Sequence, residues 1–312
     1  MTPVVSPYVG RFAPSPTGAL HFGSLIAALG SCLQARSRGG RWLVRIEDLD
    51  PPREEPGAAS EILRALERLG FEWDGPVVYQ SARTEHYQTA LAELAARGAV
   101  YECSCSRKDA LATAAGDGTS VYPGTCRAGA REPGKPTAMR VLTQPIEIAI
   151  DDRLQGTFAQ RLEHDVGDFV VRRRDGWFAY QLAVVVDDHL QNVSEVVRGA
   201  DLLDSTPRQW YLQDLLGLPH PDYVHLPVAL DAAGSKLSKQ NGAPSISQNS
   251  PARALYEALV FLDQKPPPEL RTEQCVEPIW SWAVKNWRLE PLRGVRTRVW
   301  GATAFACDGD GN

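Results

Sequence analysis

Hydrophobic and polar positions along the first hundred residues follow an order of short strands and amphipathic helices. The predicted elements are a strand at Tyr8–Phe12, a helix from Gly23 to about Arg36, a strand at Arg41–Ile46, and helices at about Ala58–Leu69 and Thr84–Arg97. Glycine follows shortly after each of the three helices, where it commonly ends a helix. Strands and helices in alternation predict an α/β fold with a parallel sheet.

The pattern changes after the first hundred residues. Residues from about Tyr101 to Gln160 contain cysteines, glycines and prolines without clear periodicity, which predicts an insertion. The α/β pattern resumes with Phe169–Val171 and the apolar run Leu182–Val186. From about Pro207 the pattern predicts a mainly helical region, with one strand near Val224–Leu230 and a last helix near Ile279–Trp287. The predicted organisation is a sheet domain in two halves (1–100 and 166–206), the insertion (101–165) and the helical region (207–312).

Composition and charge are those of an ordinary folded protein. Apolar residues make up 43% of the 312 residues and charged residues 23%, which excludes a disordered, collagen-like or coiled-coil chain. The net charge of −5 requires any RNA contact to come from a local basic patch. Because the sequence shows no signal-peptide pattern, no run long enough to span a bilayer and no disulfide framework, we expect a cytoplasmic protein without a membrane partner.

The clearest chemical motif is the segment from Arg11 to Ser24, which reads Arg-Phe-Ala-Pro-Ser-Pro-Thr-Gly-Ala-Leu-His-Phe-Gly-Ser. It places a tight turn after a strand, and then His21 and Gly23 at the start of a helix. The first amides of a helix and the positive end of its dipole attract phosphate, and a glycine lets a ring or a phosphate approach the backbone. Taken alone, such a segment is more often a turn before an ordinary helix.

A second motif with phosphate chemistry is Lys236-Leu-Ser-Lys239-Gln240, which follows a glycine-containing loop after a predicted strand. Two lysines three residues apart can close on a triphosphate and neutralise the charge that develops during its reaction. Taken alone, this motif is more often a solvent-exposed basic turn.

Together the two segments resemble the HIGH and KMSKS signatures of class I aminoacyl-tRNA synthetases. Three further blocks resemble the glutamyl branch of that class: Arg45–Asp50, Asp168–Ala183 and Val196–Pro207. The resemblance covers about residues 8–241, and the His-Phe-Gly-Ser form, the length and the cysteine pattern are most similar to the glutamyl-queuosine tRNA(Asp) synthetase family. It implies a class I synthetase fold, with a Rossmann-type parallel sheet, a zinc-containing insertion and a short helical C-terminal region. The implied activity is that of a ligase forming an aminoacyl ester, and we expect a monomer.

The resemblance also implies roles for single residues. The expected catalytic residues are His21, Lys236 and Lys239, and the residues expected to bind ATP with Mg²⁺ are His21, Gly23, Ser24, Lys236 and Lys239. Two positions depart from the class signatures, because Ser24 replaces the second histidine of HIGH and Gln240 replaces the last serine of KMSKS. Both lysines remain, so we expect activation to survive without being fast.

The charge of glutamate sets requirements for its pocket, because two carboxylates and one ammonium need at least two cations or strong donors and one anion. Arg11 and Arg198 end predicted strands at the carboxyl edge of the sheet, where α/β folds bind ligands, and a guanidinium pairs with a carboxylate through two hydrogen bonds. Glu47 ends another strand and suits the ammonium, and Tyr180 offers a hydroxyl. The positions that contact the amino acid in the resembling family correspond to Arg11, Phe12, Ala13, Pro14, Ser15, Glu47, Tyr180 and Arg198.

Three closely spaced cysteines, Cys103, Cys105 and Cys126, predict a metal site, since thiolates favour zinc. All six histidines lie outside this segment and no fourth ligand is obvious, so three reduced buried cysteines are the alternative. In the resembling family the residue that matches Tyr122 supplies the fourth ligand through its phenolate oxygen. The resemblance therefore implies one structural Zn²⁺ per chain, held by Cys103, Cys105, Tyr122 and Cys126, with no catalytic role.

The acceptor is predicted from the length of the chain beyond the lysine motif. Residues 240–312 leave room for a helical joint but not for a separate anticodon-binding domain. The resembling family lacks that domain, and esterifies the cyclopentenediol of queuosine at the wobble position of tRNA(Asp). A splayed base in a single-stranded loop suits a compact pocket. We therefore expect ATP and L-glutamate as substrates, activation without tRNA, and the anticodon stem-loop carrying queuosine as the RNA partner.

Other functions stay open at this stage. They are a truncated glutamyl-tRNA synthetase that charges the 3′ end of tRNA(Glu), a nucleotidylyltransferase such as a pantoate-type ligase, and an inactive paralogue that binds glutamate or RNA. The retained His21, Lys236 and Lys239 disfavour the inactive paralogue. The tryptophans and basic residues of the segment 282–288 suit either RNA stacking or an amphipathic helix packed on the body.

Overall fold

The computed structural model describes residues 7–106, 121–132, 134–237 and 250–300. Its first elements are β1 (Val9–Phe12), α1 (Phe22–Arg36), β2 (Arg41–Ile46), α2 (Ala58–Arg68), β3 (Val78–Tyr79) and α3 (Thr84–Ala96). The bounds predicted for β1, α1, β2, α2 and α3 differ from these by one residue at most. Short 3₁₀ turns are η1 (Pro51–Arg53), η2 (Gln80–Arg83), η3 (Ala200–Ser205), η6 (Pro268–Thr272) and η7 (Glu290–Leu292).

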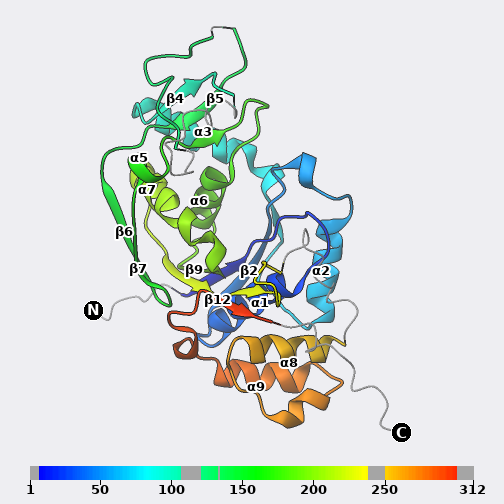
Figure 1. Cartoon of the computed structure of the whole chain (residues 1–312). Coiled ribbons are helices and arrows are strands. Elements are labelled where there is room, and N and C mark those ends of the chain that lie inside the picture. The colour runs from blue at the N-terminus through cyan, green and yellow to red at the C-terminus, as the bar shows by residue number, and fades with distance from the viewer. Residues whose placement is uncertain (1–6, 107–120, 133, 238–249, 301–312) are drawn as a thin grey trace, which may run out of the picture.

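Parallel strands form the centre of the molecule (Figure 1). β1, β2 and β3 are neighbours in that order, and β9 (Glu195–Gly199) pairs in parallel with β10 (Asp222–Leu226). The backbone N–H of Ser194, just before β9, donates to the carbonyl oxygen of Val9 at 2.9 Å, so β1 lies beside β9. The carboxyl ends of β1, β2 and β9 therefore meet at one edge, as the α/β prediction requires.

Two segments differ from the sequence pattern. The residues predicted to form the insertion also contain a hairpin of β6 (Glu147–Asp152) and β7 (Gly156–Arg161), whose first strand pairs in parallel with β10. The apolar run at residues 182–186, to which the pattern assigned no element type, lies inside α6 (Tyr180–Leu190). A short apolar run has no periodicity that separates a buried helix from a buried strand, and this run is buried throughout.

A smaller antiparallel sheet stands apart from the central strands, at the top of Figure 1. It consists of β4 (Val100–Cys103), β5 (Ala138–Val141) and β8 (Val170–Arg172), in the order β4-β5-β8. α5 (Leu162–Asp165) precedes β8. The sheet matters for the chemistry because Cys103 ends its first strand.

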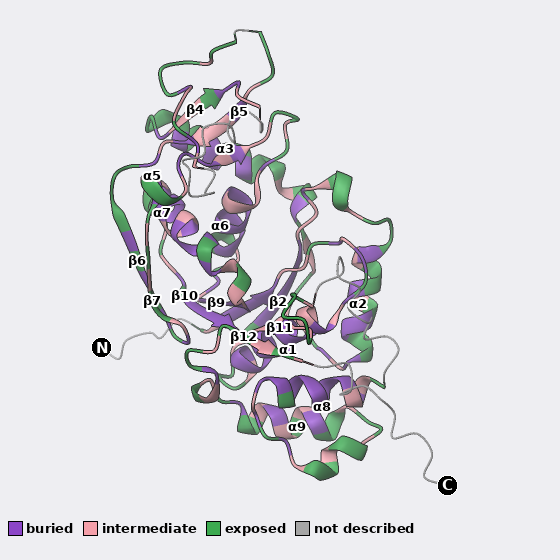
Figure 2. Cartoon of the chain, in the orientation of Figure 1, coloured by how far each residue is buried: buried purple, intermediate pink, exposed green. Residues whose placement is uncertain are grey.

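The C-terminal region contains α7 (Thr206–Leu216), β11 (Val228–Leu230), α8 (Pro251–Phe261), α9 (Glu277–Asn286) and β12 (Thr297–Val299). The single strand predicted near Val224–Leu230 is two strands, separated at Pro227, which has no N–H for a strand ladder. β11 pairs in parallel with β12. Buried residues follow the central strands and the helix faces that cover them (Figure 2). No helix in the part of the chain that the structure describes is long and apolar enough to cross a membrane.

The tryptophans of the C-terminal segment pack against the body of the protein. The indole N–H of Trp287 donates to Gln34 Oε1 in α1 at 2.8 Å, and Trp287 is buried. The indole N–H of Trp280 donates to the carbonyl oxygen of Leu69 at 2.9 Å, and Trp282 packs against the same core. Packing of an amphipathic helix is therefore the arrangement in this structure.

Candidate active site and metal centre

The start of α1 is the first part of the candidate site. His21 is the N-cap of α1, and its Nδ1 accepts from the backbone N–H of Ser24 at 3.3 Å. Its other ring nitrogen, Nε2, lies 2.9 Å from Ser24 Oγ. The first turn of α1 contains no acidic residue, so its amides and dipole present positive potential to an anion.

The two signature segments, far apart in sequence, lie against each other at this helix terminus. A Cβ atom on Gly23 would lie 3.3 Å from the carbonyl oxygen of Leu237 and 3.2 Å from the His21 ring, so a glycine suits this close approach. The adjacent Lys236 has its Nζ 2.5 Å from Asp201 Oδ2. His21, Gly23, Ser24 and Lys236 thus occupy one region, whereas Lys239 and Gln240 lie outside the described residues.

Arg11 and Glu47 belong to a buried network of charges at the carboxyl ends of β1 and β2. Arg11 is buried, and its Nε and Nη2 donate to the Asp188 carboxylate at 3.1 and 3.3 Å. The Glu47 side chain is 8% exposed, and its Oε1 accepts from Arg45 Nη2 at 3.2 Å. Arg45 Nη1 also lies 2.8 Å from Asp188 Oδ1. Asp188 therefore joins the two candidate residues through Arg45.

The electrostatics of Glu47 suit a cationic ligand. Burial raises the pKa of Glu47, and the nearby Arg45 and Arg11 guanidinium groups offset that increase only in part. The buried carboxylate is therefore less stable in its charged form than a glutamate in water, and an ammonium placed beside it would stabilise that form.

Arg198, at the end of β9, is held on several sides by neutral groups. Its Nη1 donates to the Tyr180 hydroxyl at 3.3 Å, and its Nη2 donates to Thr206 Oγ1 at 2.8 Å and to the Leu202 carbonyl oxygen at 3.3 Å. Its Nε donates to His225 Nε2 at 3.0 Å. Burial raises the pKa of Tyr180, which also interacts electrostatically with Arg198, Glu47 and Arg11. The side chains of Arg11, Glu47, Tyr180 and Arg198 therefore face one region.

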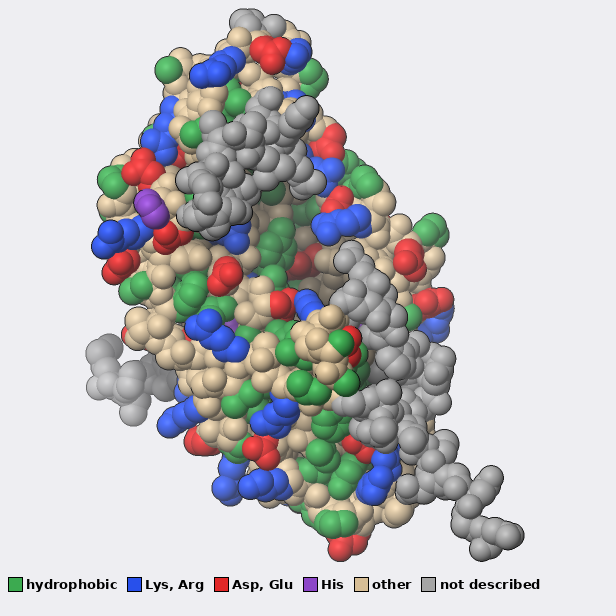
Figure 3. All heavy atoms as spheres, viewed as in Figure 1, with side chains coloured by type: hydrophobic (Ala, Val, Ile, Leu, Met, Phe, Trp, Pro, Cys, Tyr) green, Lys and Arg blue, Asp and Glu red, His purple; other side chains and the backbone are tan. Residues whose placement is uncertain are grey.

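The turn after β1 is tied to the same region through its backbone. The backbone N–H of Glu47 donates to the Pro14 carbonyl oxygen at 3.0 Å. Ala13 is partly buried and Ser15 is exposed, whereas the Phe12 ring stacks on Trp42 in the core. Phe12 can therefore meet a ligand only through its backbone. The space-filling view shows the molecule hollowed between the part that carries β4 and β5 and the part that carries α8 and α9 (Figure 3).

Sequence reasoning did not identify the residues that hold the candidates in place. They are Arg45, Asp188, Thr206 and His225, together with Asp187, which pairs with Arg45, and Asp152, which pairs with His225. Two adjacent acidic residues in an otherwise apolar helix were a usable signal, because a buried carboxylate requires a partner. No signal marked His225, since its partners come from segments distant in sequence.

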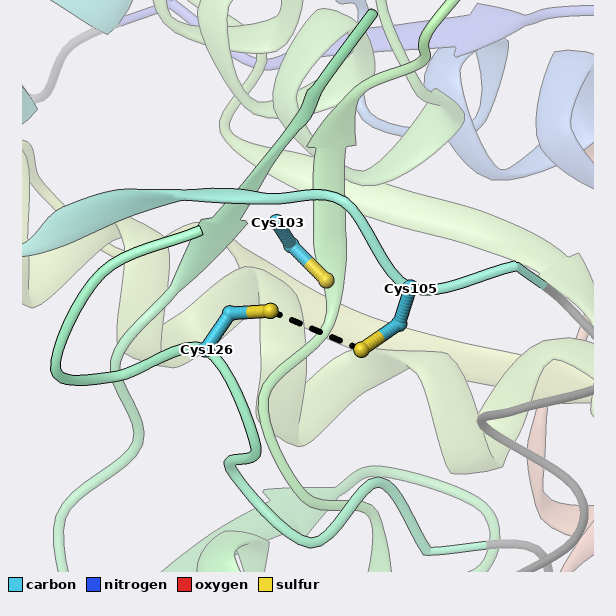
Figure 4. Close-up of side chains that lie close together, drawn as sticks. All are labelled: Cys103, Cys105 and Cys126. Carbon is cyan, nitrogen blue, oxygen red and sulfur yellow. Dashed lines mark hydrogen bonds between the residues drawn. The ribbon is translucent and has the colours of Figure 1, made fainter. Parts of the chain in front are cut away.

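Three cysteines form a compact cluster at the end of β4. Figure 4 shows the sulfur atoms of Cys103, Cys105 and Cys126 pointing toward one another. All three lie within 4.8 Å of each other, and Cys105 Sγ is 3.5 Å from Cys126 Sγ. Tetrahedral zinc with bonds of about 2.3 Å to sulfur requires sulfur atoms about 3.8 Å apart. The arrangement could hold a metal.

Tyr122 completes the cluster on a fourth side. Its hydroxyl oxygen lies 3.3 Å from Cys103 Sγ and 3.4 Å from Cys105 Sγ. The Arg140 guanidinium lies 3.9 Å from the centre of the Tyr122 ring, and its Nε donates to Cys103 Sγ at 3.3 Å. Burial acts to raise the pKa of Cys126, but hydrogen bonds from the Arg131 and Ser104 backbone lower it to about 6. Burial raises the pKa of Cys105 and of Tyr122, so Cys126 is the ligand whose anionic form these surroundings favour.

Comparisons with known proteins agree with this geometry. The family model for the catalytic domain of class I tRNA synthetases (E and Q) matches residues 8–260. The chain is 56% identical over 290 residues to the glutamyl-Q tRNA(Asp) synthetase of Dechloromonas aromatica (strain RCB), covering 92% of this chain and 96% of that protein. It is 56% identical over 283 residues to the protein of the same name in Chromobacterium violaceum, covering 90% and 94%.

A solved structure shows the same fold. The glutamate tRNA ligase of Elizabethkingia meningosepticum, solved in complex with its amino acid, superposes with a TM-score of 0.78 at 22% identity, covering 96% of this chain and 68% of that one.

The parallel sheet, the helix α1 with His21 as its N-cap, and the family match define a class I aminoacyl-tRNA synthetase, which is a ligase that uses ATP. Within that class, the chain belongs to the glutamyl-Q tRNA(Asp) synthetase family. The predicted fold class, family resemblance and ligase assignment are confirmed, while the roles of single residues stay predictions.

Proposed function

We propose that the protein activates L-glutamate with ATP in the absence of tRNA, and transfers the glutamyl group to the cyclopentenediol of queuosine at the wobble position of tRNA(Asp). The observation that carries the activation step is the position of Arg11, Glu47, Tyr180 and Arg198 at one edge of the sheet, near the N-terminus of α1. The printed names of the relatives support the acceptor.

Glutamate fits this edge by charge. The charged form of the buried Glu47 is stabilised by a neighbouring ammonium, and Arg198 is a cation with neutral hydrogen-bond partners that is stabilised by a carboxylate. Arg11 supplies the second guanidinium, although Asp188 already holds two of its nitrogens. The backbone of Phe12, at the end of β1, and the turn residues Ala13, Pro14 and Ser15 border the amino acid.

ATP fits the adjoining helix terminus. His21, Gly23, Ser24, Lys236 and Lys239 are the proposed ATP contacts, and His21 with the two lysines acts on the transition state. An oxygen of the glutamate α-carboxylate attacks the α-phosphorus of ATP and forms a new oxygen–phosphorus bond. The bond from the α-phosphorus to the oxygen that bridges to the β-phosphate breaks, and pyrophosphate leaves. Mg²⁺, when bound with ATP, offsets phosphate charge.

Lys236 must leave Asp201 to reach a phosphate. The pair is partly exposed, with 47% of the lysine side chain and 35% of the aspartate side chain accessible. Exposed pairs of this kind contribute only about 0.2–1 kcal/mol. A triphosphate, which carries several negative charges, can therefore replace the single carboxylate of Asp201.

The metal centre is proposed to hold one structural Zn²⁺ through Cys103, Cys105, Tyr122 and Cys126. The sulfur–sulfur and sulfur–oxygen spacings fit a closed tetrahedral site, and Arg140 offsets the negative charge of the ligands. A closed site leaves no position for a substrate, so its role is to tie the segment around Cys126 to the end of β4.

The acceptor is tested with radiolabelled glutamate and two tRNA preparations, one from normal cells and one from cells unable to make queuosine. Glutamate-dependent exchange between ATP and pyrophosphate, run without tRNA, first checks the activation step. We expect exchange without tRNA, and label only on the tRNA that contains queuosine. Equal labelling of both preparations refutes the queuosine acceptor and indicates charging of the 3′ end of tRNA(Glu). Absent exchange refutes activation without tRNA.

A further inference from the structure

A chain of buried hydrogen bonds leads from Arg198 to the end of the β6–β7 hairpin. Arg198 Nε donates to His225 Nε2 at 3.0 Å, and His225 Nδ1 lies 2.6 Å from Asp152 Oδ2. The side chains of His225 and Asp152 are both fully buried. The three residues come from β9, β10 and β6, so the series of hydrogen bonds crosses three neighbouring strands.

The chemistry of the donors fixes where the proton on the imidazole lies. An arginine nitrogen can only donate, so His225 Nε2 must present its lone pair to Arg198. The proton therefore lies on Nδ1, which donates to Asp152. Burial lowers the pKa of His225 to about 4, and the nearby Arg198 charge acts in the same direction. The imidazole is thus neutral at physiological pH.

Asp152 is held as an anion in a single orientation. Its Oδ1 accepts from the backbone N–H groups of Leu154 at 2.9 Å, Gln155 at 2.8 Å and His225 at 3.3 Å. Its Oδ2 is left for the His225 ring. Because three backbone donors determine which oxygen faces which way, the carboxylate fixes the His225 tautomer.

We propose that Asp152 and His225 are positioning residues that orient the Arg198 guanidinium for the substrate carboxylate. The inference deepens the proposed function and rests on it. With Nε held by His225, and Nη2 held by Thr206 and Leu202, the guanidinium is fixed in its plane, with Nη1 toward Tyr180. A cation fixed in this way loses little rotational freedom when it binds a carboxylate, so the effect falls on glutamate affinity.

The decisive variant is Asp152→Asn, which keeps the size of the side chain. Its amide oxygen takes the place of Oδ1, because the three backbone N–H groups require an acceptor there. Its NH₂ group then faces His225 Nδ1, which must give up its proton and accept. The proton moves to Nε2, which then no longer accepts from Arg198 Nε and has Thr206 Oγ1, 3.3 Å away, as its remaining partner.

The matched control is Asp151→Asn, the same chemical change on the preceding residue of β6. The Asp151 side chain accepts from Thr157 Oγ1 at 2.7 Å on the exposed face of the hairpin and has no contact with the chain of hydrogen bonds. A second pair of variants checks the imidazole. His225→Gln can keep an acceptor for Arg198, whereas His225→Asn keeps only a donor for Asp152.

The measurements are KM for glutamate, KM for ATP, kcat in pyrophosphate exchange, and the melting temperature. We expect Asp152→Asn and His225→Asn to raise KM for glutamate about tenfold, because each variant loses one hydrogen bond to the charged Arg198. KM for ATP and kcat should change little. Asp151→Asn and His225→Gln should stay within about threefold of the wild type.

The outcomes distinguish the positioning role from the proposed function. The positioning role is overturned if Asp152→Asn leaves KM for glutamate unchanged, or if a lower melting temperature is its sole effect. In either case, glutamate-dependent exchange by the wild type still supports the activation step of the proposed function. Equal effects of His225→Gln and His225→Asn also overturn it. Absent glutamate-dependent exchange by the wild type overturns the proposed function and this inference together.

Discussion

Glu47→Gln separates affinity for glutamate from stability of the fold. The change removes one negative charge and keeps the shape of the side chain. The new amide oxygen can still accept from Arg45 Nη2. Arg45 Nη1 keeps its contacts with Asp188 Oδ1 at 2.8 Å and with Gln191 Oε1 at 2.6 Å. The variant should therefore fold, with its pocket short of the anion proposed to bind the ammonium of glutamate.

The magnitude follows from the type of contact that is lost. A hydrogen bond to a charged group contributes about 1.5–3 kcal/mol, which corresponds to a rise of roughly 10- to 150-fold in KM for glutamate. The free energy of unfolding, in contrast, should not fall in the variant. Burial raises the pKa of Glu47 in the folded state, so the ionised carboxylate costs stability above that pKa, and stability falls as pH rises through it. The glutamine variant should be at least as stable as the wild type at pH 8.

The assay is pyrophosphate exchange across glutamate concentrations from pH 5 to 8, with thermal melting of the same samples. The pKa of Glu47 is raised, so the wild type should lose kcat/KM for glutamate as pH falls through that pKa and approach the variant, whose amide does not titrate. Glu67→Gln, on the exposed face of α2, is the matched control. An unchanged KM at pH 8, or a KM that rises only where the melting temperature falls, would refute the reasoning.

Two further predictions concern the lysine loop and the metal. Lys236→Ala should lower kcat for activation about 10²- to 10³-fold with KM for glutamate nearly unchanged, because the lysine is proposed to act on the transition state. The control is Lys135→Ala, which changes an exposed lysine paired with Glu132 and should leave both constants unchanged. A raised glutamate KM with a normal kcat would contradict that role. Cys126→Ser should reduce zinc, measured by elemental analysis, from one per chain to near zero, whereas Cys275→Ser, which changes an exposed cysteine, should retain it. Metal-free wild-type protein with full activity would rule out the zinc site.

The sequence predicted the elements that local periodicity controls, and not those that depend on distant partners. Helices such as α3 have their own apolar face and a glycine after the last turn, so their bounds were predictable. The β6–β7 hairpin escaped prediction because β6 is stabilised by β10, more than 60 residues later. Similarly, motif and charge predicted Arg11, Glu47 and Arg198. The adjacent acidic residues of α6 indicated that Asp188 needs a buried partner but not which one, and nothing local indicated that His225 would hold Arg198.

The three buried arginines of the site differ in how their charge is balanced, and this difference bears on substrate choice. Arg11 and Arg45 each contact the Asp188 carboxylate. Within the described residues, the hydrogen-bond partners of Arg198 are all neutral: two hydroxyls, a backbone carbonyl and the His225 ring. A buried cation without a counter-charge is costly, and a carboxylate removes that cost whereas a carboxamide does not. A neutral His225 is necessary for this balance, since an imidazolium would place a second cation beside the first. In the proposed site, the hydrogen bond from Arg198 to His225 therefore leaves the arginine charge for a carboxylate of glutamate, and we expect glutamine to bind less tightly.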